Sequence, residues 1–326
     1  MDESRLPSRE RGRERMVLIA RLRAWWQRFR AMPGHIQQLA QDSARLSAEL
    51  ARLQGEVARR IDESHQHLLR DLPPRAALLS FGLTASAKSQ PLPVEPRVPM
   101  ACSKAPAEMD QLWARLAQLK PALFPIWREL FENDTHAYAE DADASCSHMD
   151  SEYSRLFRAF VDLLAVGPTL DIGVGSLVDP HYLAGLPQEN LAGIDPRPFE
   201  GGATRIRRFE GFCEFLPFGD ETFSTVISGT SLDHVLDLPR SLKEIHRVLT
   251  RNGRALLWLA SVPYSPSPLD SSEPFAPADR FHLFHFDRSW LDPLLTDHFV
   301  IADVVEIPQV GFNHVFYHLS RRESLR

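Results

Sequence analysis

The sequence of 326 residues predicts an α/β protein with a doubly wound, mostly parallel sheet of seven strands. From residue 153 onward, short apolar segments typical of strands alternate with helical segments, the pattern of a parallel sheet with helices on both faces. A strand at 169–172 runs directly into an Asp-x-Gly-x-Gly turn. The last two predicted strands are close enough in sequence to pair as an antiparallel hairpin at one edge. The expected strands are 169–172, 191–194, 204–209, 225–228, 254–259, 300–306 and 314–320.

Helices of the α/β part are expected at 153–164, 238–249 and 287–298. The chain before residue 153 is predicted to be organised differently. Breaks in composition at prolines and glycines then divide the whole chain into five parts. They are a basic, partly disordered arm (1–34), a coiled-coil helix (35–72), a proline-rich linker (73–106), a helical lid or cap (107–152) and the α/β domain (153–326).

The basic arm contains a helix candidate at 16–32, in which arginines are interspersed with Trp25, Trp26 and Phe29. One interpretation is an amphipathic helix that packs on the rest of the protein. The other is a helix that lies on an anionic membrane surface, because arginines attract acidic lipid and aromatic rings prefer the interface. The arm carries nine Arg against four acids, a net charge of +5, so the remaining residues sum to −11.

The segment 35–72 is predicted to be a long helix with coiled-coil spacing. Apolar side chains recur at intervals of three and four residues, which is the a and d pattern of a heptad. The pattern slips at Arg60, after about three heptads. Self-association is therefore expected, and the alternative is a helix docked on the α/β domain. The seam consists of Ile36, Leu39, Ser43, Leu46, Leu50, Leu53 and Val57.

Prolines and polar residues mark the two segments that follow. Seven prolines between 73 and 106 predict an irregular linker, and Pro73-Pro74 is expected to stop the preceding helix. Residues 108–131 are helical in pattern, whereas 132–152 are acidic and polar and are expected to form a loop.

Composition excludes several classes of protein. A net charge of −6 and an acidic body argue against a nucleic-acid partner. The three cysteines form no CxxC pair, so a disulfide framework and a zinc ribbon are not expected, and a reducing cytoplasm fits best. No apolar run approaches the length of a membrane span. No spacing of His, Asp or Glu resembles a ligand set, so no metal site is expected.

The informative motif begins at Asp171. Glycine at 173 and 175 permits a tight turn and close approach of a ligand to the backbone. Twenty residues after Gly175 comes Asp195, directly after the apolar strand 191–194. A carboxylate at that strand end is well placed to bind two ribose hydroxyls. A dehydrogenase fingerprint would need a third glycine where this chain has Val178.

Further motifs follow in a fixed order. The stretch Glu214-Phe-Leu-Pro-Phe-Gly-Asp220 precedes a strand, then comes Ser231-Leu-Asp-His-Val235, and then the helix Glu244-Ile-His-Arg-Val-Leu249 with Asn252-Gly253. With these motifs, residues 150–320 resemble the class I S-adenosylmethionine-dependent methyltransferases, and within them the methyltransferase type 11-like group. The resemblance implies a Rossmann-like methyltransferase fold and S-adenosylmethionine as cofactor.

The resemblance also implies roles for individual residues. Gly173 and Gly175 would lie under the methionine and ribose, and Asp171 would reach the methionine amino group. Asp195 would bind the ribose and Pro196 would flank the adenine. The remaining expected cofactor contacts are Phe212, Cys213 and Glu214 around the adenine, and Ser228 and Thr230, together with Gly229, facing the methyl group.

This chain departs from the family pattern at three positions. Leu177 stands where a third glycine is frequent, Phe212 where an acid is frequent, and Ser224 where an Asp is usual. These differences leave open a non-catalytic scaffold with the methyltransferase fold. Asp171, both glycines and Asp195 nevertheless remain.

The molecule that accepts the methyl group is the aspect of the function that the sequence determines least. A hydroxyl acceptor needs a base, for which His234, His285 and Asp233 are the candidates, with His282 as a further one. The stretch Thr230–Val235 and the helical extension resemble methyltransferases of bacterial surface-polysaccharide pathways. That implies O-methylation of a sugar on a surface or lipid-linked glycan, in the cytoplasm and with the basic arm at the inner membrane. The alternative acceptor is a small molecule of lipid or secondary metabolism.

Overall fold

The computed structural model describes residues 43, 45–57, 59–60, 63, 72–84, 109–140, 150–268 and 276–322. The predicted helix at 16–32, most of the arm and most of the linker therefore lie outside the described residues. The chain divides into two compact units, residues 1–60 and 61–326. Within the described residues, no helix combines the length and the apolar character that crossing a membrane requires.

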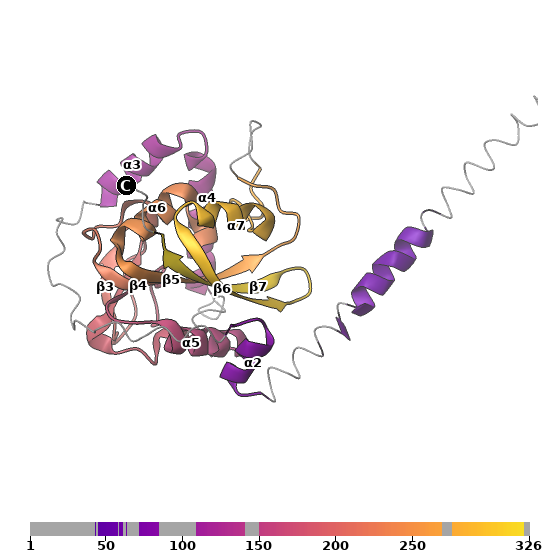
Figure 1. Ribbon diagram of the computed structural model, residues 1–326. Coiled ribbons are helices and arrows are strands. Elements are labelled where there is room, and N and C mark those ends of the chain that lie inside the picture. Colours follow the sequence, from indigo (N-terminus) through magenta and orange to yellow (C-terminus); the bar gives the residue numbers. More distant parts are fainter. Residues whose placement is uncertain are drawn as a thin grey trace, which may run out of the picture. The chain divides into compact units, whose positions relative to one another are not determined.

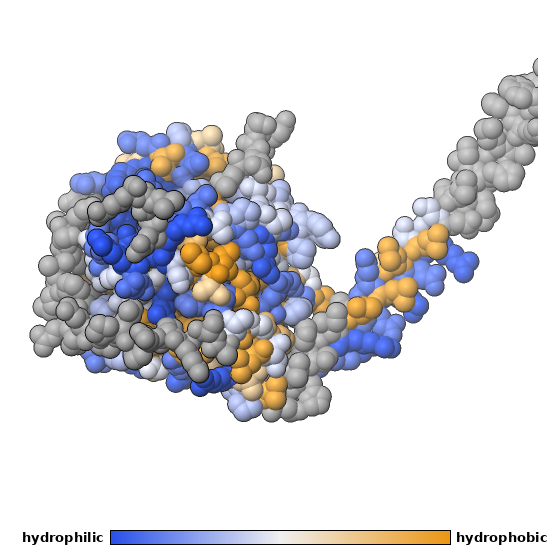
Figure 2. All heavy atoms as spheres, in the orientation of Figure 1, coloured by the Kyte–Doolittle hydropathy of each residue, from blue (hydrophilic) through white to orange (hydrophobic). Residues whose placement is uncertain are grey.

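In the first unit, residues 45–57 form a helix with one apolar face. Leu46, Leu50, Leu53 and Val57 lie on this face and are between 47% and 67% exposed. Figure 2 shows apolar side chains along one side of this helix. The predicted helical state is thus confirmed over 45–57, and self-association through this face stays a prediction.

The second unit contains the predicted seven-stranded sheet, in the order β3-β2-β1-β4-β5-β7-β6. Strands β3, β2, β1, β4 and β5 are parallel, and β7 pairs antiparallel with both β5 and β6. The expected hairpin at the sheet edge is confirmed. The strands are β1 (Thr169–Ile172), β2 (Leu191–Asp195), β3 (Arg207–Glu210), β4 (Phe223–Gly229), β5 (Leu249–Ser261), β6 (Phe299–Pro308) and β7 (Asn313–Arg321).

Helices cover both faces of the sheet (Figure 1). One face carries α3, α4, α6 and α7, and its apolar layer includes Trp127 and Phe212. The other face carries α2 and α5, and its layer includes Phe157 and Trp258. Because both faces are covered, every residue of the central strands β1 and β2 is buried, whereas the edge strand β3 is only partly buried. The helices are α2 (Pro74–Ser80), α3 (Met109–Leu119), α4 (Phe124–Glu140), α5 (Glu152–Leu164), α6 (Leu238–Val248) and α7 (Arg288–Thr296).

The start of the predicted linker is a helix that belongs to the core. Pro73 is the N-cap residue of α2, and Pro74 is its first residue, where proline lacks only an amide that the helix would not use. Ala77 and Leu78 are fully buried beside α5. Beyond the helix, the amide of Glu306 in β6 donates to the carbonyl of Phe81. The proline pair therefore begins a helix, and the expectation of an irregular linker is wrong for residues 74–80.

Helix α4 is longer than the sequence pattern indicates. Residues 132–140, expected as loop, continue the helix that begins at Phe124. Trp127, Phe131 and Asp134 recur at helical spacing and face the same cavity, so packing at this face stabilises the helix although the segment is acidic. This continuation brings Asp134 to the functional site.

Candidate functional site

A cavity opens at the carboxyl ends of β1, β2 and β4, where the strand order reverses between β1 and β4. This switch point is where doubly wound sheets bind ligands. Of the residues expected from sequence, nine line the cavity: Gly173, Asp195, Pro196, Phe212, Cys213, Glu214, Gly229, Thr230 and His234. The expected residues Asp171, Gly175, Ser228, Asp233 and His285 lie outside this lining.

The glycine turn after β1 requires glycine for two reasons. Gly173 and Gly175 have φ of +76° and +75°, in the left-handed region that favours glycine. A Cβ added at Gly173 would lie 2.3 Å from Cβ of Ser231, so the loop after β4 packs directly on this turn. Gly175 lies behind the cavity, and its amide donates to Oδ2 of Asp195 over 2.9 Å. The turn thus holds the carboxylate at the end of β2 in place.

Asp195 is buried and has a second partner that the sequence did not indicate. Its Oδ1 accepts hydrogen bonds from the amide of Arg197 over 3.0 Å and from Nε of Arg197 over 3.1 Å. The guanidinium also lies 3.7 Å from Oδ2 of Asp134 on α4. Arg197 therefore bridges the carboxylate at the end of β2 and a carboxylate on the opposite wall of the cavity.

Asp134 is a cavity residue that sequence reasoning missed, because it falls in the segment expected as loop. Burial raises the pKa of this carboxyl above its ordinary value, and the positive fields of His234, Arg197 and His282 partly oppose that rise. A carboxyl with a raised pKa in a cleft is typical of sites that bind or move protons.

Asp171 points to the other face of the sheet, away from the cavity lining. Both of its carboxylate oxygens accept from the hydroxyl of Tyr182, at 3.0 and 3.1 Å. Burial raises the pKa of Asp171 well above its ordinary value, although the Tyr182 hydrogen bond opposes the shift. In this structure Asp171 anchors Tyr182, whose ring in turn packs against Gly229 at the end of β4.

Glu214 is buried and holds backbone amides. Its Oε1 accepts from the amides of Leu236 and Asp237, at 2.7 and 3.2 Å. Burial raises the pKa of Glu214, and these backbone hydrogen bonds oppose the rise. The carboxylate thus fixes the segment that leads from the β4 loop into α6. That segment includes His234.

An aromatic wall closes one side of the cavity. The ring centroid of Phe212 lies 4.7 Å from that of Trp113 and 6.0 Å from that of Trp127, and Trp127 stacks on Phe131 at 5.6 Å. These distances are in the range of favourable ring contacts. Helices α3 and α4, expected as a lid, supply three of these rings. Cys213 is buried beside Phe212, and burial raises the pKa of its thiol well above its ordinary value.

The loop after β4 is strained and tightly bonded. Thr230 has φ of +53°, an unusual conformation for a residue with a branched side chain. Ser228 and Ser231 share a hydrogen bond of 2.7 Å between hydroxyls, and Ser231 donates to the carbonyl of Ile172 over 2.7 Å. Strain of this kind persists where the surroundings over-determine the backbone, and it is concentrated at functional sites.

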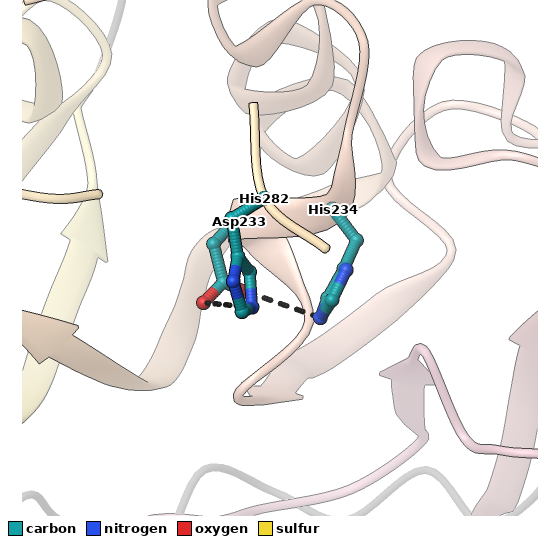
Figure 3. Close-up of side chains that lie close together, drawn as sticks. All are labelled: Asp233, His234 and His282. Carbon is teal, nitrogen blue, oxygen red and sulfur yellow. Dashed lines mark ion pairs between the residues drawn. The ribbon is translucent and has the colours of Figure 1, made fainter. Parts of the chain in front are cut away.

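At the end of this loop lies a group that we name the Asp–His–His cluster: Asp233, His234 and His282 (Figure 3). Nε2 of His234 lies 3.9 Å from Oδ1 of Asp233, and Nε2 of His282 lies 3.7 Å from Oδ2 of Asp233. The two imidazole centroids are 4.6 Å apart. His234 lines the cavity, whereas Asp233 and His282 are not among its lining residues.

His282, rather than His285, is the imidazole that meets His234. Nδ1 of His282 lies 2.8 Å from Oδ2 of Asp279, and Nε2 of His285 lies 3.3 Å from the same oxygen on its other side. Burial lowers the pKa of His282, but the carboxylates of Asp233 and Asp279 outweigh it and the pKa rises above its ordinary value. The linear spacing did not connect these residues because His282 lies beyond β5.

The sequence matches a family model described as a methyltransferase domain over residues 170–257. The chain is similar to the demethylmenaquinone methyltransferase of Symbiobacterium thermophilum, with 30% identity over 193 residues, 53% of this chain and 69% of that protein. It is 31% identical over 102 residues to the demethylmenaquinone methyltransferase of Chlorobaculum parvum, 30% of this chain and 42% of that protein. The chain thus spans less than half of this second relative.

A solved structure, the 1,6-didemethyltoxoflavin-N1-methyltransferase of Burkholderia thailandensis, superposes with a TM-score of 0.47. Its sequence identity is 16%, and the match covers 60% of this chain and 88% of the other.

Proposed function

The chain is a class I S-adenosylmethionine-dependent methyltransferase, and from this premise we propose that it methylates a small hydroxylated molecule. The single observation that carries the proposal is the position of His234 and Asp134. Both line the same cavity as Asp195 and Gly173, so polar groups able to bind an acceptor face the place of the cofactor.

The residues of the cavity fit S-adenosylmethionine. Gly173 lines the cavity and has no side chain, so a ligand can approach its backbone closely. We propose that Gly173 lies under the methionine, that Asp195 binds the ribose hydroxyls, and that Pro196, Phe212, Cys213 and Glu214 surround the adenine. Asp171, Gly175 and Ser228 would support this site from behind.

When bound, the cofactor would supply a methyl group activated by its sulfonium, with the thioether S-adenosylhomocysteine as the leaving group of an in-line displacement. The role of this chain is to align the acceptor within reach of that carbon. Thr230, at the end of β4, would face the methyl group. We name the part of the lining that consists of His234 and Asp134 the acceptor wall, and the proton of the acceptor would pass to one of these two side chains.

The small-molecule acceptor is favoured over the glycan that the loop sequence suggests. The two relatives described above are named for a quinone substrate, demethylmenaquinone. In its reduced, quinol form a ring of that kind would stack on the aromatic wall of Trp127 and Phe131, and one of its hydroxyls would face His234. Of the three expected bases, His234 lines the cavity, whereas Asp233 lies 3.9 Å from its Nε2 and outside the lining, and His285 would act only through Asp279.

The test is a transfer assay with S-adenosylmethionine labelled on its methyl group. Reduced naphthoquinones without a ring methyl group and lipid-linked sugar acceptors are offered in parallel. Label in the quinol fraction supports the proposal, and label in the glycan fraction alone overturns it. Calorimetry with S-adenosylhomocysteine separates both from a non-catalytic scaffold, which would show no binding.

We also propose that the chain self-associates through the apolar face of the 45–57 helix. The exposed leucines keep heptad spacing, and a second copy of the same helix offers a matching face.

We further propose that the enzyme is cytoplasmic and that residues 16–32 bind an anionic membrane surface. Flotation with anionic liposomes tests it: a chain lacking residues 1–34 should no longer float, and equal flotation of both chains would contradict the membrane contact.

A further inference from the structure

We propose that the Asp–His–His cluster binds a divalent transition-metal ion of the zinc type at the acceptor end of the cavity. The three side chains offer two imidazole nitrogens and a carboxylate, and the ligand atoms all lie within 4.8 Å of one another. Such a donor set suits a zinc-like ion rather than Mg²⁺ or Ca²⁺, which prefer oxygen ligands.

The spacing between the ligand atoms fits an ion better than direct hydrogen bonds. Both imidazole Nε2 atoms lie 3.7–3.9 Å from an oxygen of Asp233, too far for a hydrogen bond. Ligands about 2.1 Å from a common tetrahedral ion are separated by roughly 3.4 Å. A small inward movement of these side chains would complete the site.

Asp233 is a buried carboxylate with an unused oxygen. Its side chain is 10% exposed, and its Oδ1 accepts no hydrogen bond from residues in the part of the chain that the structure describes. A buried acceptor without a partner is costly and calls for a ligand. This Oδ1 atom lies 3.9 Å from Nε2 of His234, and Figure 3 shows the three side chains close together.

His282 is already oriented as a ligand. Its Nδ1 faces Asp279 at 2.8 Å, which leaves Nε2 pointing to Asp233. Asp279 is itself held by the amides of Phe281 and His282, at 2.7 and 2.8 Å. A carboxylate behind a histidine is the arrangement that fixes the tautomer and the ring of metal-bound imidazoles. The carbonyl of His234 accepts a hydrogen bond from Nε1 of Trp127 over 2.7 Å, which fixes the backbone that carries the second imidazole.

Three protein ligands leave a position open on the ion. Because His234 lines the cavity, that position would face the cavity, where an oxygen of the acceptor could bind. With the ion bound, Nε2 of His234 would be a ligand, so Asp134 would be the side chain that accepts the proton of the acceptor. This last step rests on the proposed function, whereas binding of the ion does not. The metal measurement below and the calorimetry with S-adenosylhomocysteine therefore fail independently.

The test uses the full chain after treatment with a chelator, titrated with Co²⁺ alone and followed by its visible absorption, with Zn²⁺ as competitor. We expect one Co²⁺ per chain, displaced by Zn²⁺ and not by Mg²⁺. Asp279→Asn should weaken Co²⁺ binding by about ten- to a hundredfold. Asp233→Asn and His282→Asn should weaken it more, because each removes a ligand.

The matched control is His246→Gln, from the surface pair His246 and His298, whose rings are 5.6 Å apart. This variant should keep the affinity. Equal Co²⁺ binding by wild type, Asp233→Asn and His282→Asn would overturn the proposal, as would loss in the control alone. If the ligand variants do not fold, chemical modification of histidines in the wild type provides the test. Zn²⁺ should protect His234 and His282 from modification but should not protect His246. Equal reactivity of His234 and His282 with and without Zn²⁺ would overturn the proposed site.

Discussion

Nε of Arg197 lies 3.1 Å from Oδ1 of Asp195, so the carboxylate at the end of β2 is paired with a cation from its own loop. The same guanidinium reaches towards Asp134 across the cavity. A ribose bound at Asp195 would share that carboxylate with Arg197, which links the cofactor end of the cavity to the acceptor wall.

Replacement of Asp195 tests the cofactor site. Asp195→Asn keeps the shape but removes the charge that would accept from two ribose hydroxyls. Because hydrogen bonds to charged groups contribute about 1.5–3 kcal/mol, affinity for S-adenosylhomocysteine should fall roughly ten- to a hundredfold in calorimetry. Asp220→Asn changes an exposed carboxylate outside the cavity and should bind like the wild type. Unchanged affinity in Asp195→Asn would remove this residue from the ribose site.

Replacement of Gly173 tests the turn. Gly173→Ala forces a side chain into left-handed backbone, at a cost of about 1–2 kcal/mol, and places its Cβ against Ser231. The melting temperature and the S-adenosylhomocysteine affinity should both decrease. Gly202→Ala is the control, since a Cβ there meets nothing within 4 Å. A Gly173→Ala chain as stable as Gly202→Ala would show that the turn tolerates a side chain.

The acceptor wall is tested by His234→Gln and Asp134→Asn. One of these two residues is expected to be the base, and its replacement should lower kcat of methyl transfer by about a hundredfold or more. A correctly positioned side chain that transfers a proton contributes that much to the rate. Binding of S-adenosylhomocysteine should change little in either variant. His246→Gln, on the exposed side of α6, controls for loss of an imidazole. Full activity in both wall variants would place the proton acceptor elsewhere.

His314 predicts how stability depends on pH. Its Nδ1 accepts from Nε1 of Trp258 over 3.1 Å, and burial lowers the pKa of this imidazole to about 4. The imidazole of His314 therefore binds a proton more tightly in the unfolded chain than in the folded one. Its contribution to the free energy of unfolding is complete above the unfolded pKa near 6.5. This contribution is lost as the pH falls towards 4.

Between pH 7.5 and pH 5, the free energy of unfolding should fall by roughly 2 kcal/mol through this group alone. His314→Asn keeps an acceptor for Trp258 but does not titrate. Urea unfolding at the two pH values should therefore show a smaller loss in this variant than in the wild type. An identical loss would mean that His314 contributes nothing to the acid sensitivity.

Self-association is tested at Leu50, which is 58% exposed on the 45–57 helix. Leu50→Lys puts a charge into the apolar seam and should convert the oligomer to a monomer in light scattering, with catalytic activity of the folded unit retained. Ala48→Lys lies off the seam and should keep the oligomer. A monomeric wild type, or an unchanged mass for Leu50→Lys, would contradict the coiled coil.

The sheet and the cavity residues at the ends of β1 and β2 could be predicted from sequence because their signals are local. Strand β1 has the predicted bounds, and Gly173 and Asp195 both line the cavity. The surroundings of His234 could not be predicted, because they depend on contacts between distant segments. Helical continuation of α4 brings Asp134 to the cavity, and the fold of the loop after β5 turns His282 rather than His285 towards His234.

The docked segment 72–84 has a consequence for the solubility of the protein. Strand β6 lies at one edge of the sheet, and an uncovered edge strand is a template for pairing with another chain. The carbonyl of Phe81 takes one amide of β6, and both the amide and the hydroxyl of Thr84 donate to Asp303 on the same strand. These residues shield the edge from intermolecular β-pairing. A chain that begins at residue 85 should therefore aggregate at concentrations where a chain that begins at Leu72 stays dispersed.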